Sequence, residues 1–240
     1  MFRMIKPPKH LESLCRKALN EFNLLESVDH LGLALSGGKD SLTLLFLLHA
    51  INGCGFPPFK MTAFHVQGAF SCGPSVTGNY LKNLCNSLDV ELVICTSEQK
   101  REKLECYSCS RERRKLIFEA AKKHGATSIA FGHHRDDSLQ TLLMNTLHKG
   151  EFAANLPKVP MHHYGITIIR PLIHISEQEI LAFAKEKGFA RITCQCPVGQ
   201  NSKRKAAEHL LSQMEAIFPN ARSNLSRLSL ELGSDKAMRP

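Results

Sequence analysis

The sequence predicts an α/β protein with a Rossmann-like parallel sheet that carries helices on both faces. Short apolar runs alternate along the chain with segments whose apolar residues recur at helical spacing, and strands that alternate with helices form a parallel sheet. The apolar run Leu31–Leu35 leads directly into a glycine loop, and a long apolar helix follows from Leu42. Hydrophobic residues make up 43% of the 240 residues, so the chain can form a sizeable core.

Each element follows from its own pattern. Apolar residues at helical spacing predict an amphipathic helix over 11–25. Ser176 and Glu179 have the spacing of a capping box at the start of a later helix. Residues 150–164, rich in proline and histidine, predict a long connecting loop. The predicted strands are 31–35, 60–66, 90–95, 127–131 and 166–169, and the other predicted helices are the stretch from 42, 75–88, 111–124, 136–147, 176–187, 203–217 and 221–232.

The chain divides into three segments. Residues 1–30 form an N-terminal helical segment, residues 31–190 form the α/β domain, and residues 191–240 form a C-terminal helical segment with a Cys-Pro motif near its start. No apolar run approaches the ~20 residues of a membrane-spanning helix, and the N-terminal residues lack the apolar core of a signal peptide. We therefore expect a soluble cytoplasmic protein with no membrane partner.

The charge of the chain favours a polyanionic partner. Lysine and arginine total 31 against 22 acidic residues, which gives a net charge of +9. The excess is concentrated in residues 100–123, with nine basic and four acidic residues, and in residues 185–240, with ten and five. Nucleic acid is such a partner, because each phosphate contact releases counterions. A solvated basic surface is the alternative.

The cysteines are unusual in number and in spacing. There are nine, and an odd number without a secretion signal argues against a disulfide framework. The closely spaced cysteines at 106 and 109, and at 194 and 196, need a different explanation from the others. Four cysteines stand alone in apolar or helical patterns and are expected to be buried free thiols, namely Cys15, Cys54, Cys85 and Cys95.

Residues 106–109, C-Y-S-C, form a C-x-x-C motif at the start of a predicted helix. This spacing allows two thiolates to bind one metal centre, and a helix N-terminus lowers the pKa of a thiol. A redox dithiol and two unrelated thiols are the alternatives. Cys194 and Cys196 could complete a metal site with the first pair. Four cysteines would form a closed zinc or iron–sulfur site, whereas three would leave one iron of a 4Fe-4S cluster open.

Residues 36–41, S-G-G-K-D-S, stand between a predicted strand and a predicted helix. The adjacent Gly37 and Gly38 let backbone N–H groups approach an anion closely. The N-terminus of the following helix adds free N–H groups and the positive end of its dipole, and Ser36 and Ser41 add hydroxyl donors. These features predict a phosphate-binding loop with a spacing different from the Walker A loop. A plain strand-to-helix turn is the alternative.

Two further motifs carry charge. Residues 110–114, S-R-E-R-R, directly follow the C-x-x-C motif and would either contact phosphate groups or form a solvated basic face. Residues 132–137, G-H-H-R-D-D, follow a predicted strand and place Asp136 and Asp137 at the ligand-binding edge of the sheet. These carboxylates would cap the next helix, or at least one would bind magnesium or position a substrate.

The motif S-G-G-K-D-S after an apolar strand resembles the signature of the PP-loop ATP pyrophosphatases. Together with C-Y-S-C-S-R-E-R-R, G-H-H-R-D-D-S-L-Q-T, I-R-P-L-I-H-I-S-E-Q-E-I and a late Cys-Pro, it makes residues 11–200 similar to the tRNA 2-thiocytidine synthetase family. The resemblance implies the adenine nucleotide alpha hydrolase fold. It also implies an ATP-dependent tRNA sulfurtransferase, which adenylates the C2 oxygen of a cytidine in the tRNA anticodon loop and replaces it with sulfur.

The resemblance implies roles for residues of the glycine loop and of the charged motifs. ATP and Mg²⁺ would bind at the glycine loop, with Lys39, Arg113 and Arg114 stabilising negative charge. The nucleotide-binding candidates are Ser36, Gly37, Gly38, Lys39, Asp40, Ser41 and Gly132, and the catalytic candidates are Asp40, Arg113, Asp136 and Asp137.

The second implied cofactor is a 4Fe-4S cluster. Cys106 and Cys109 would be two of its ligands, and Cys196, which precedes a proline, would be the third, with Cys194 as the alternative. The open iron would carry the sulfur, a donor such as a cysteine desulfurase system would supply it, and a homodimer is a further expectation. Residues 65–68, H-V-Q-G, depart from the family, which often has an aspartate after the second strand.

Three other functions remain open. A 2-thiouridine synthetase shares the loop and the cluster but usually carries additional zinc-binding cysteine pairs near its chain ends, which this sequence does not show. A lysidine synthetase would leave the closely spaced cysteines unexplained. A non-catalytic metal-binding protein that binds RNA would not need an intact glycine loop together with Asp136 and Asp137.

Overall fold

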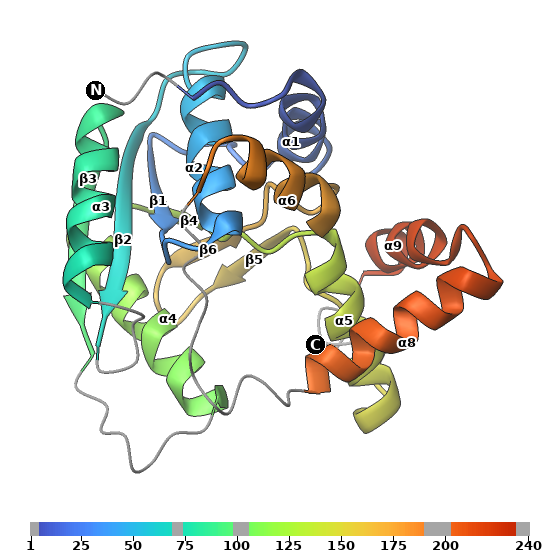
Figure 1. The fold of residues 1–240 in the computed structure, drawn as a ribbon. Helices are drawn as coiled ribbons and strands as arrows, with labels where there is room; N and C mark the ends of the chain where they lie inside the picture. The colour runs from blue at the N-terminus through green and yellow to red at the C-terminus, as the bar shows by residue number, and fades with distance from the viewer. Residues whose placement is uncertain (1–4, 69–73, 98–105, 190–202, 234–240) are drawn as a thin grey trace.

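The computed structural model describes residues 5–68, 74–97, 106–189 and 203–233. Within them, six strands form one sheet in the order β3-β2-β1-β4-β6-β5 (Figure 1). Every pairing is parallel except that of β5 with β6. The strands are β1 (His30–Ala34), β2 (Lys60–Gln67), β3 (Glu91–Thr96), β4 (Ser128–Ala130), β5 (Lys158–Met161) and β6 (Ile166–Ile169). The predicted parallel α/β fold is confirmed, with one antiparallel edge strand added.

The predicted helices are present, the last two with the predicted bounds and the others with shifted ends. The fourth helix begins at Cys106, five residues earlier than its apolar spacing indicated, so the C-x-x-C motif lies within its first turn. The capping box is confirmed, since Ser176 Oγ accepts the Glu179 N–H at 3.2 Å. The helices are α1 (Lys9–Glu21), α2 (Lys39–Ile51), α3 (Pro74–Ser87), α4 (Cys106–Lys123), α5 (Arg135–Lys149), α6 (Glu177–Glu186), α8 (Lys203–Ile217) and α9 (Ala221–Leu232).

The prediction of an uninterrupted loop over 150–164 is wrong, because it contains β5. This strand is only four residues long and includes Pro160, which argued against a strand. Proline is tolerated here because β5 lies at the edge of the sheet and pairs on one side only, with β6.

The sheet separates two apolar clusters because side chains alternate along each strand. On β2, Met61 and Ala63 belong to the cluster that contains buried residues of α1, α2, α3 and α6. Phe64 and Val66 belong to the second cluster, which contains buried residues of α4. Helices therefore cover both faces. The N-terminal helix α1 shares the first cluster with α2, so the predicted N-terminal segment packs directly on the α/β core.

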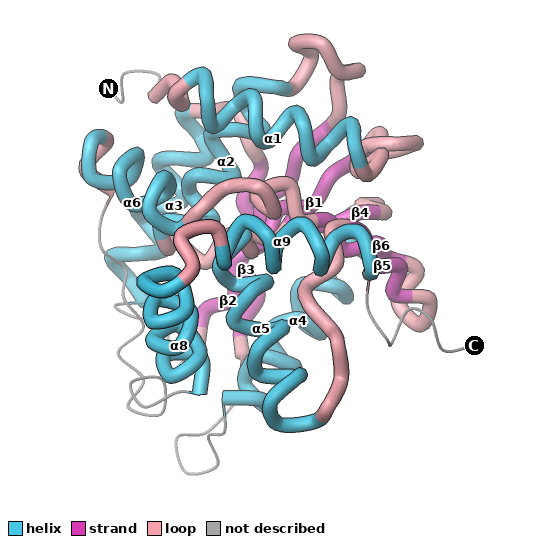
Figure 2. The backbone as a smooth tube through the Cα atoms, turned by 90° about the vertical axis from the view of Figure 1, so that its right-hand side faces the viewer, coloured by secondary structure: helices cyan, strands magenta, loops and turns pink. Residues whose placement is uncertain are grey.

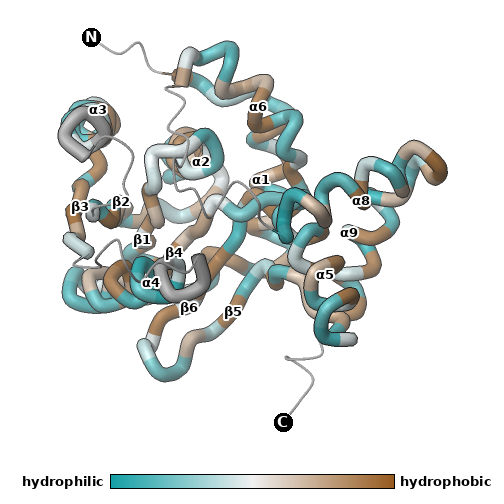
Figure 3. Tube along the Cα trace, turned by 60° about the horizontal axis from the view of Figure 1, so that its bottom comes forward, coloured by the Kyte–Doolittle hydropathy of each residue, from teal (hydrophilic) through white to brown (hydrophobic). Residues whose placement is uncertain are grey.

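The C-terminal helices α8 and α9 pack against α5 at one side of the sheet, as Figures 1 and 2 show. The tip where α8 leads towards α9 is hydrophobic and exposed (Figure 3). Ile217 and Phe218, at this tip, are 71% and 65% exposed. Among the described helices, none combines the length and the apolar composition needed to cross a membrane.

Candidate active site

Two loops that the sequence singled out lie side by side at the carboxyl ends of neighbouring strands. The loop 35–38 follows β1 and leads into α2, and the loop 131–134 follows β4 and leads into α5. Strand β1 pairs with β2 on one side and with β4 on the other, so the chain continues on opposite sides of β1. The gap between the carboxyl ends of β1 and β4 is therefore the topological switch point of the sheet, where ligands bind in open α/β sheets.

The glycine loop is held in shape by its own two serines. Ser36 Oγ lies 3.0 Å from Ser41 Oγ, and the Gly37 N–H donates to Ser41 Oγ at 3.2 Å. The Gly38 N–H donates to Ser36 Oγ at 3.3 Å. Gly37 has a φ of +85°, which favours glycine, and Gly38 has no side chain that could cap the first turn of α2. The N-terminus of α2 is thus suited to an anion.

Gly132 lets the loop after β4 lie directly against the first turn of α2. A Cβ atom at this position would be 3.0 Å from the Asp40 carbonyl carbon and 3.0 Å from the Ser41 nitrogen. Both atoms belong to the backbone, so a side chain could be accommodated only if one of the loops moved. This contact accounts for the glycine whether or not it also touches a nucleotide.

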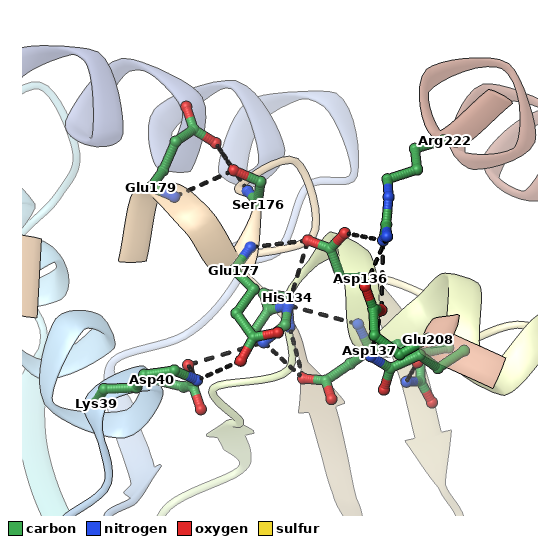
Figure 4. Close-up of polar contacts among 12 residues, drawn as sticks. Lys39, Asp40, His134, Asp136, Asp137, Ser176, Glu177, Glu179, Glu208 and Arg222 are labelled. Carbon is green, nitrogen blue, oxygen red and sulfur yellow. Dashed lines mark hydrogen bonds and ion pairs between the residues drawn. The ribbon is translucent and has the colours of Figure 1, made fainter. Parts of the chain in front are cut away.

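Lys39 joins the glycine loop to helix α6. Its Nζ lies 2.8 Å from Asp40 Oδ1 and 3.0 Å from Glu177 Oε1 (Figure 4). Burial works against its charge, but the two carboxylates outweigh burial and raise the pKa of Lys39. The ammonium group therefore stays charged next to the loop, as a charge-stabilising role requires.

His134 is buried and contacts several residues of the site, although it was not among the site residues predicted from the sequence. It is the N-cap of α5, where its Nδ1 accepts the Asp137 N–H at 3.4 Å and its own N–H donates to Asp137 Oδ2 at 3.2 Å. Nδ1 is therefore unprotonated in the neutral ring, and the proton is on Nε2. This atom lies 3.4 Å from Asp137 Oδ2 and 3.7 Å from Asp40 Oδ1. A capping residue three positions before an acidic residue was the available signal.

Asp136 is buried and uses both carboxylate oxygens within the protein. Oδ2 accepts the backbone N–H of Glu177 at 2.7 Å, and Oδ1 accepts from Arg222 Nη1 at 2.8 Å (Figure 4). The first contact supports the start of α6, and the second ties α5 to α9. Asp137 is similarly engaged, since its Oδ1 accepts from Arg204 Nη1 at 2.9 Å.

Arg222 is buried and lies at the centre of a group of polar contacts that we call the Arg222 network. Besides Asp136, its guanidinium contacts Glu208 at 2.6 Å, Glu215 at 2.9 Å and Ser212 Oγ at 3.2 Å. Burial opposes its charge, yet the hydrogen bonds to Glu208 and Glu215 raise its pKa above the usual value. No pattern in the sequence singles out Arg222, because a basic side chain in a basic helical tail gives no signal of its partners.

Arg113 of α4, a predicted charge-stabilising residue, also lies near the ligand-binding edge of the sheet. Arg113 is half-buried, and its charge acts on His65 of β2, whose Nδ1 donates to the Leu35 carbonyl at 2.8 Å. Burial lowers the pKa of His65 and Arg113 lowers it further, while the hydrogen bond to Leu35 opposes both. Arg113 is thereby placed near the ends of β1 and β2.

His133 lies beside Gly132 and is held neutral. Arg170 Nε donates to His133 Nδ1 at 3.3 Å, and the ring stacks on Phe131 with centroids 5.6 Å apart. Burial and the charge of Arg170 lower the pKa of His133 to about 4. Burial also lowers the pKa of Arg170, to about 10.

The predicted cluster ligands are only partly described. Cys106 is the first residue of α4 and Cys109 lies one turn along it, but their side chains are outside the description. Cys194 and Cys196 fall in 190–202, outside the described residues. Within the described part of the chain, no group of three or more His, Cys, Asp or Glu side chains could hold a metal ion.

Of the four lone cysteines, two fit the prediction of buried thiols. Burial raises the pKa of Cys15 to about 12 and that of Cys85 to about 11. Cys95 is half-buried. For Cys54 the prediction is wrong, because it is exposed in a turn between two glycines, where Arg16 Nη1 binds its carbonyl at 2.6 Å.

The sheet, the serine-braced loop at its switch point and the free N-terminus of α2 define a nucleotide-binding α/β protein. The PP-loop domain family matches residues 9–204. The tRNA-cytidine(32) 2-sulfurtransferase of Geobacter metallireducens is 33% identical over 218 residues, covering 88% of this chain and 85% of that protein. The enzyme of the same name from Syntrophotalea carbinolica is 33% identical, with 94% and 87% covered. The chain therefore belongs to the PP-loop family and, within it, to the tRNA-cytidine(32) 2-sulfurtransferases.

A solved structure supports the same fold. The U34-tRNA thiolase NcsA from Methanococcus maripaludis, with its 4Fe-4S cluster, aligns with a TM-score of 0.72 and 22% identity. The alignment covers 91% of this chain and 76% of that one. The family and the fold expected from the sequence motifs are thus confirmed.

Proposed function

We propose that this chain catalyses ATP-dependent thiolation of tRNA, in which sulfur replaces the C2 oxygen of a cytidine in the anticodon loop. Membership of the tRNA-cytidine(32) 2-sulfurtransferase family supports the substrate. The observation that carries the proposal is the glycine loop, whose serines, glycines and helix N-terminus form a phosphate cradle at the switch point.

The first step consumes ATP. The C2 oxygen of cytidine attacks the α-phosphorus, a new P–O bond forms, and the bond to the β-phosphate oxygen breaks so that pyrophosphate leaves. The loop amides and the first turn of α2 would hold the phosphates, and Lys39 would offset the charge that develops on them. The C2 oxygen is a poor leaving group by itself, but adenylation makes it part of a phosphate ester, which leaves easily as AMP.

The second step introduces sulfur. A hydrosulfide ion attacks C2, the C2–O bond breaks with AMP as the leaving group, and the proton of the hydrosulfide passes to solvent. No side chain of this protein needs to bond to the base. The hydrosulfide comes from a separate donor. Where the donor is a persulfide made by a cysteine desulfurase system, a thiol reductant supplies the two electrons that cleave its S–S bond and release the outer sulfur as hydrosulfide.

The described residues distinguish two candidate positions for the magnesium ion that accompanies ATP. Asp136 has both oxygens engaged, by Glu177 and Arg222. Asp40 lies at the loop with its side chain 32% exposed and pairs with Lys39 through Oδ1. Asp40 therefore fits a magnesium ligand better than Asp136, which fits a role as a positioning residue. Arg113 and Asp137 remain candidates for charge stabilisation and positioning.

A 4Fe-4S cluster fits the placement of the first cysteine pair. Cys106 and Cys109 occupy positions i and i+3 in the first turn of α4, which puts them on one face of the helix at its positive end. When bound by three cysteines, such a cluster offers one open iron to an incoming sulfur.

The test begins with anaerobic purification and iron and sulfide analysis of the intact chain and of Cys106→Ala, Cys194→Ala and Cys196→Ala. We expect about four irons and four sulfides, lost in the Cys106 and Cys196 variants and retained in the Cys194 variant. One zinc and no iron would contradict the cluster.

The reaction is tested with ATP, tRNA and sulfide, by measuring pyrophosphate release and analysing the nucleosides of the digested tRNA by mass spectrometry. Appearance of 2-thiocytidine supports the proposal. Appearance of 2-thiouridine would assign the chain to a different thiolation, and no pyrophosphate with any tRNA would exclude the enzyme. Light scattering of the holoprotein would test the expected homodimer.

A further inference from the structure

A pocket of about 480 Å³ lies beside the ligand-binding edge, between α1, the start of α5 and α9. Three cationic side chains line it, one from each helix: Lys17, Arg135 and Arg227. His174, from the segment between β6 and α6, lines it as well. Arg135 belongs to the G-H-H-R-D-D motif, yet neither the glycine loop nor the Arg222 network involves its side chain.

Two of the three cations already have carboxylate partners in the pocket wall. Lys17 Nζ lies 4.0 Å from Glu21, and Arg227 Nη1 lies 3.1 Å from Glu231. Glu21 also contacts His174 Nε2 at 3.0 Å. Burial lowers the pKa of His174 in spite of Glu21, so this ring adds no full positive charge near pH 7. Glu21 and Glu231, the two acidic residues that line the pocket, therefore pair with residues other than Arg135.

Within the described part of the chain, the Arg135 side chain has no carboxylate partner. Its backbone N–H donates to the Ile175 carbonyl at 3.0 Å, which fixes the start of α5. Its side-chain Nε is buried and has no hydrogen-bond partner among the described residues. Because Arg135 lines the pocket, an anion would reach its guanidinium through the two outer nitrogens rather than through the buried Nε. The guanidinium fork suits an oxyanion such as phosphate.

We propose that this pocket is a phosphate-binding site in which the Arg135 guanidinium contacts a phosphodiester of the tRNA, away from the nucleoside that reacts. The identity of the ligand as tRNA rests on the proposed function. Arg135 directly follows His134, whose Nε2 lies 3.7 Å from Asp40 Oδ1 at the glycine loop, so a tRNA bound at the active site would pass close to this pocket. Free inorganic phosphate is the alternative ligand, because it would offer Arg135 the same oxygen atoms.

The first experiment measures tRNA affinity by filter binding at several salt concentrations, using the full chain. Arg135→Gln is compared with wild type, with Arg135→Lys, and with Lys60→Gln, which removes an exposed cation paired with Glu91 at the opposite edge of the sheet, where β2 and β3 begin. We expect Arg135→Gln to weaken binding about five- to tenfold and to reduce the slope of log Kd against log salt by about one. The affinity of Arg135→Lys should fall between those of wild type and Arg135→Gln, and that of Lys60→Gln should stay within about twofold of wild type.

The second experiment titrates inorganic phosphate calorimetrically, with the glycine loop filled by a non-hydrolysable ATP analogue. Loss of phosphate binding in Arg135→Gln with unchanged tRNA affinity would make free phosphate the ligand and overturn the tRNA contact. No change in either titration overturns the site altogether. If wild type binds no tRNA, the proposed function fails, while the phosphate titration still decides whether the pocket binds phosphate. Matching unfolding midpoints for the variants would show that the fold is intact.

Discussion

The glycine loop and the Arg222 network meet at the same edge of the sheet but are held together by contacts of different range. In the loop, each hydrogen bond of Ser36 and Ser41 joins residues no more than five positions apart. Arg222, in contrast, contacts Asp136 across 86 positions of sequence. The loop can therefore take its shape from local sequence, whereas the network exists only once α8 and α9 have docked on α5. Changes in the loop should affect nucleotide handling first, and changes in the network should affect stability first.

The glycine loop and the Arg222 network are nevertheless connected through Asp136 and Glu177. Asp136 receives Arg222 on one oxygen and the backbone N–H of Glu177 on the other. The Glu177 side chain in turn pairs with Lys39, which begins the helix after the glycine loop. A continuous path therefore runs from the C-terminal helices to the phosphate cradle, and mutations along it can show whether the regions act separately.

The largest effect is expected from Gly132→Val. The new Cβ would approach the backbone of Asp40 and Ser41 to 3.0 Å, and backbone atoms cannot turn aside as a side chain can. We expect pyrophosphate release to fall by about 100-fold or more, since displacements near 1 Å in a reacting site have such effects. Steady-state kinetics with ATP and tRNA provides the measurement.

The matched control is Gly78→Val on α3, where no atom of the described residues lies within 4 Å of the added Cβ. Its activity should remain within about twofold of wild type, because the added side chain meets no neighbouring residue and valine is a better helix former than glycine. Equal losses of activity in both variants would show that the contact of Gly132 with α2 is not what maintains the loop.

The difference in contact range also explains what the sequence could predict. The strands, most helices and the glycine loop depend on periodicity and on neighbouring residues, and they were predicted correctly. The short edge strand β5 was missed because Pro160 argues against a strand unless its edge position is known. Arg222 and His134 were missed because their partners come from three different helices, and no local pattern states which helices will touch.

The next largest effect is expected from Arg222→Met. Removing the guanidinium leaves Asp136 buried with an unmatched charge, while Glu208 and Glu215 can turn towards solvent. Because removing one partner of a buried ion pair is strongly destabilising, we expect the free energy of unfolding to fall by about 2–4 kcal/mol. Urea unfolding measures this. Arg227→Met, which breaks an exposed pair on the same helix, should cost less than about 0.5 kcal/mol.

Asp136→Asn separates a positioning role from magnesium binding. The amide can still accept the Glu177 N–H but loses the charge opposite Arg222, which keeps Glu208 and Glu215. We expect a stability loss of about 1–2 kcal/mol and an unchanged magnesium dependence of pyrophosphate release. Asp40→Asn is the comparison, and it should shift that dependence. A tenfold weaker response to magnesium in Asp136→Asn, with stability unchanged, would reverse the two assignments.

His133 makes the stability of the protein depend on pH. Burial and Arg170 lower the pKa of His133 to about 4, with Arg204 and His134 acting in the same direction and Asp137 opposing them. Between pH 6.5 and 4 the unfolded chain binds a proton that the folded protein excludes, so stability falls as pH falls through this range. One proton gives a slope of at most ~1.4 kcal/mol per pH unit.

Urea unfolding of wild type and His133→Asn at several pH values isolates this contribution from the other histidines. The variant should lose part of the acid sensitivity, while His148→Asn, at an exposed position on α5, should retain the wild-type slope. Identical slopes for all three proteins would mean that His133 titrates equally in both states.

The smallest effect is expected from Glu177→Gln, which cuts the path between the two regions without removing the backbone N–H that Asp136 accepts. The Lys39 and Glu177 side chains are 26% and 39% exposed, and Lys39 keeps Asp40 as a partner. We expect a stability change below about 1 kcal/mol and a change in the KM for ATP below about threefold, both shrinking at high salt. The double variant with Arg222→Met should show additive effects, since the two side chains share no direct contact. An interaction free energy above about 1 kcal/mol in that cycle would mean that the C-terminal helices and the glycine loop act as one unit.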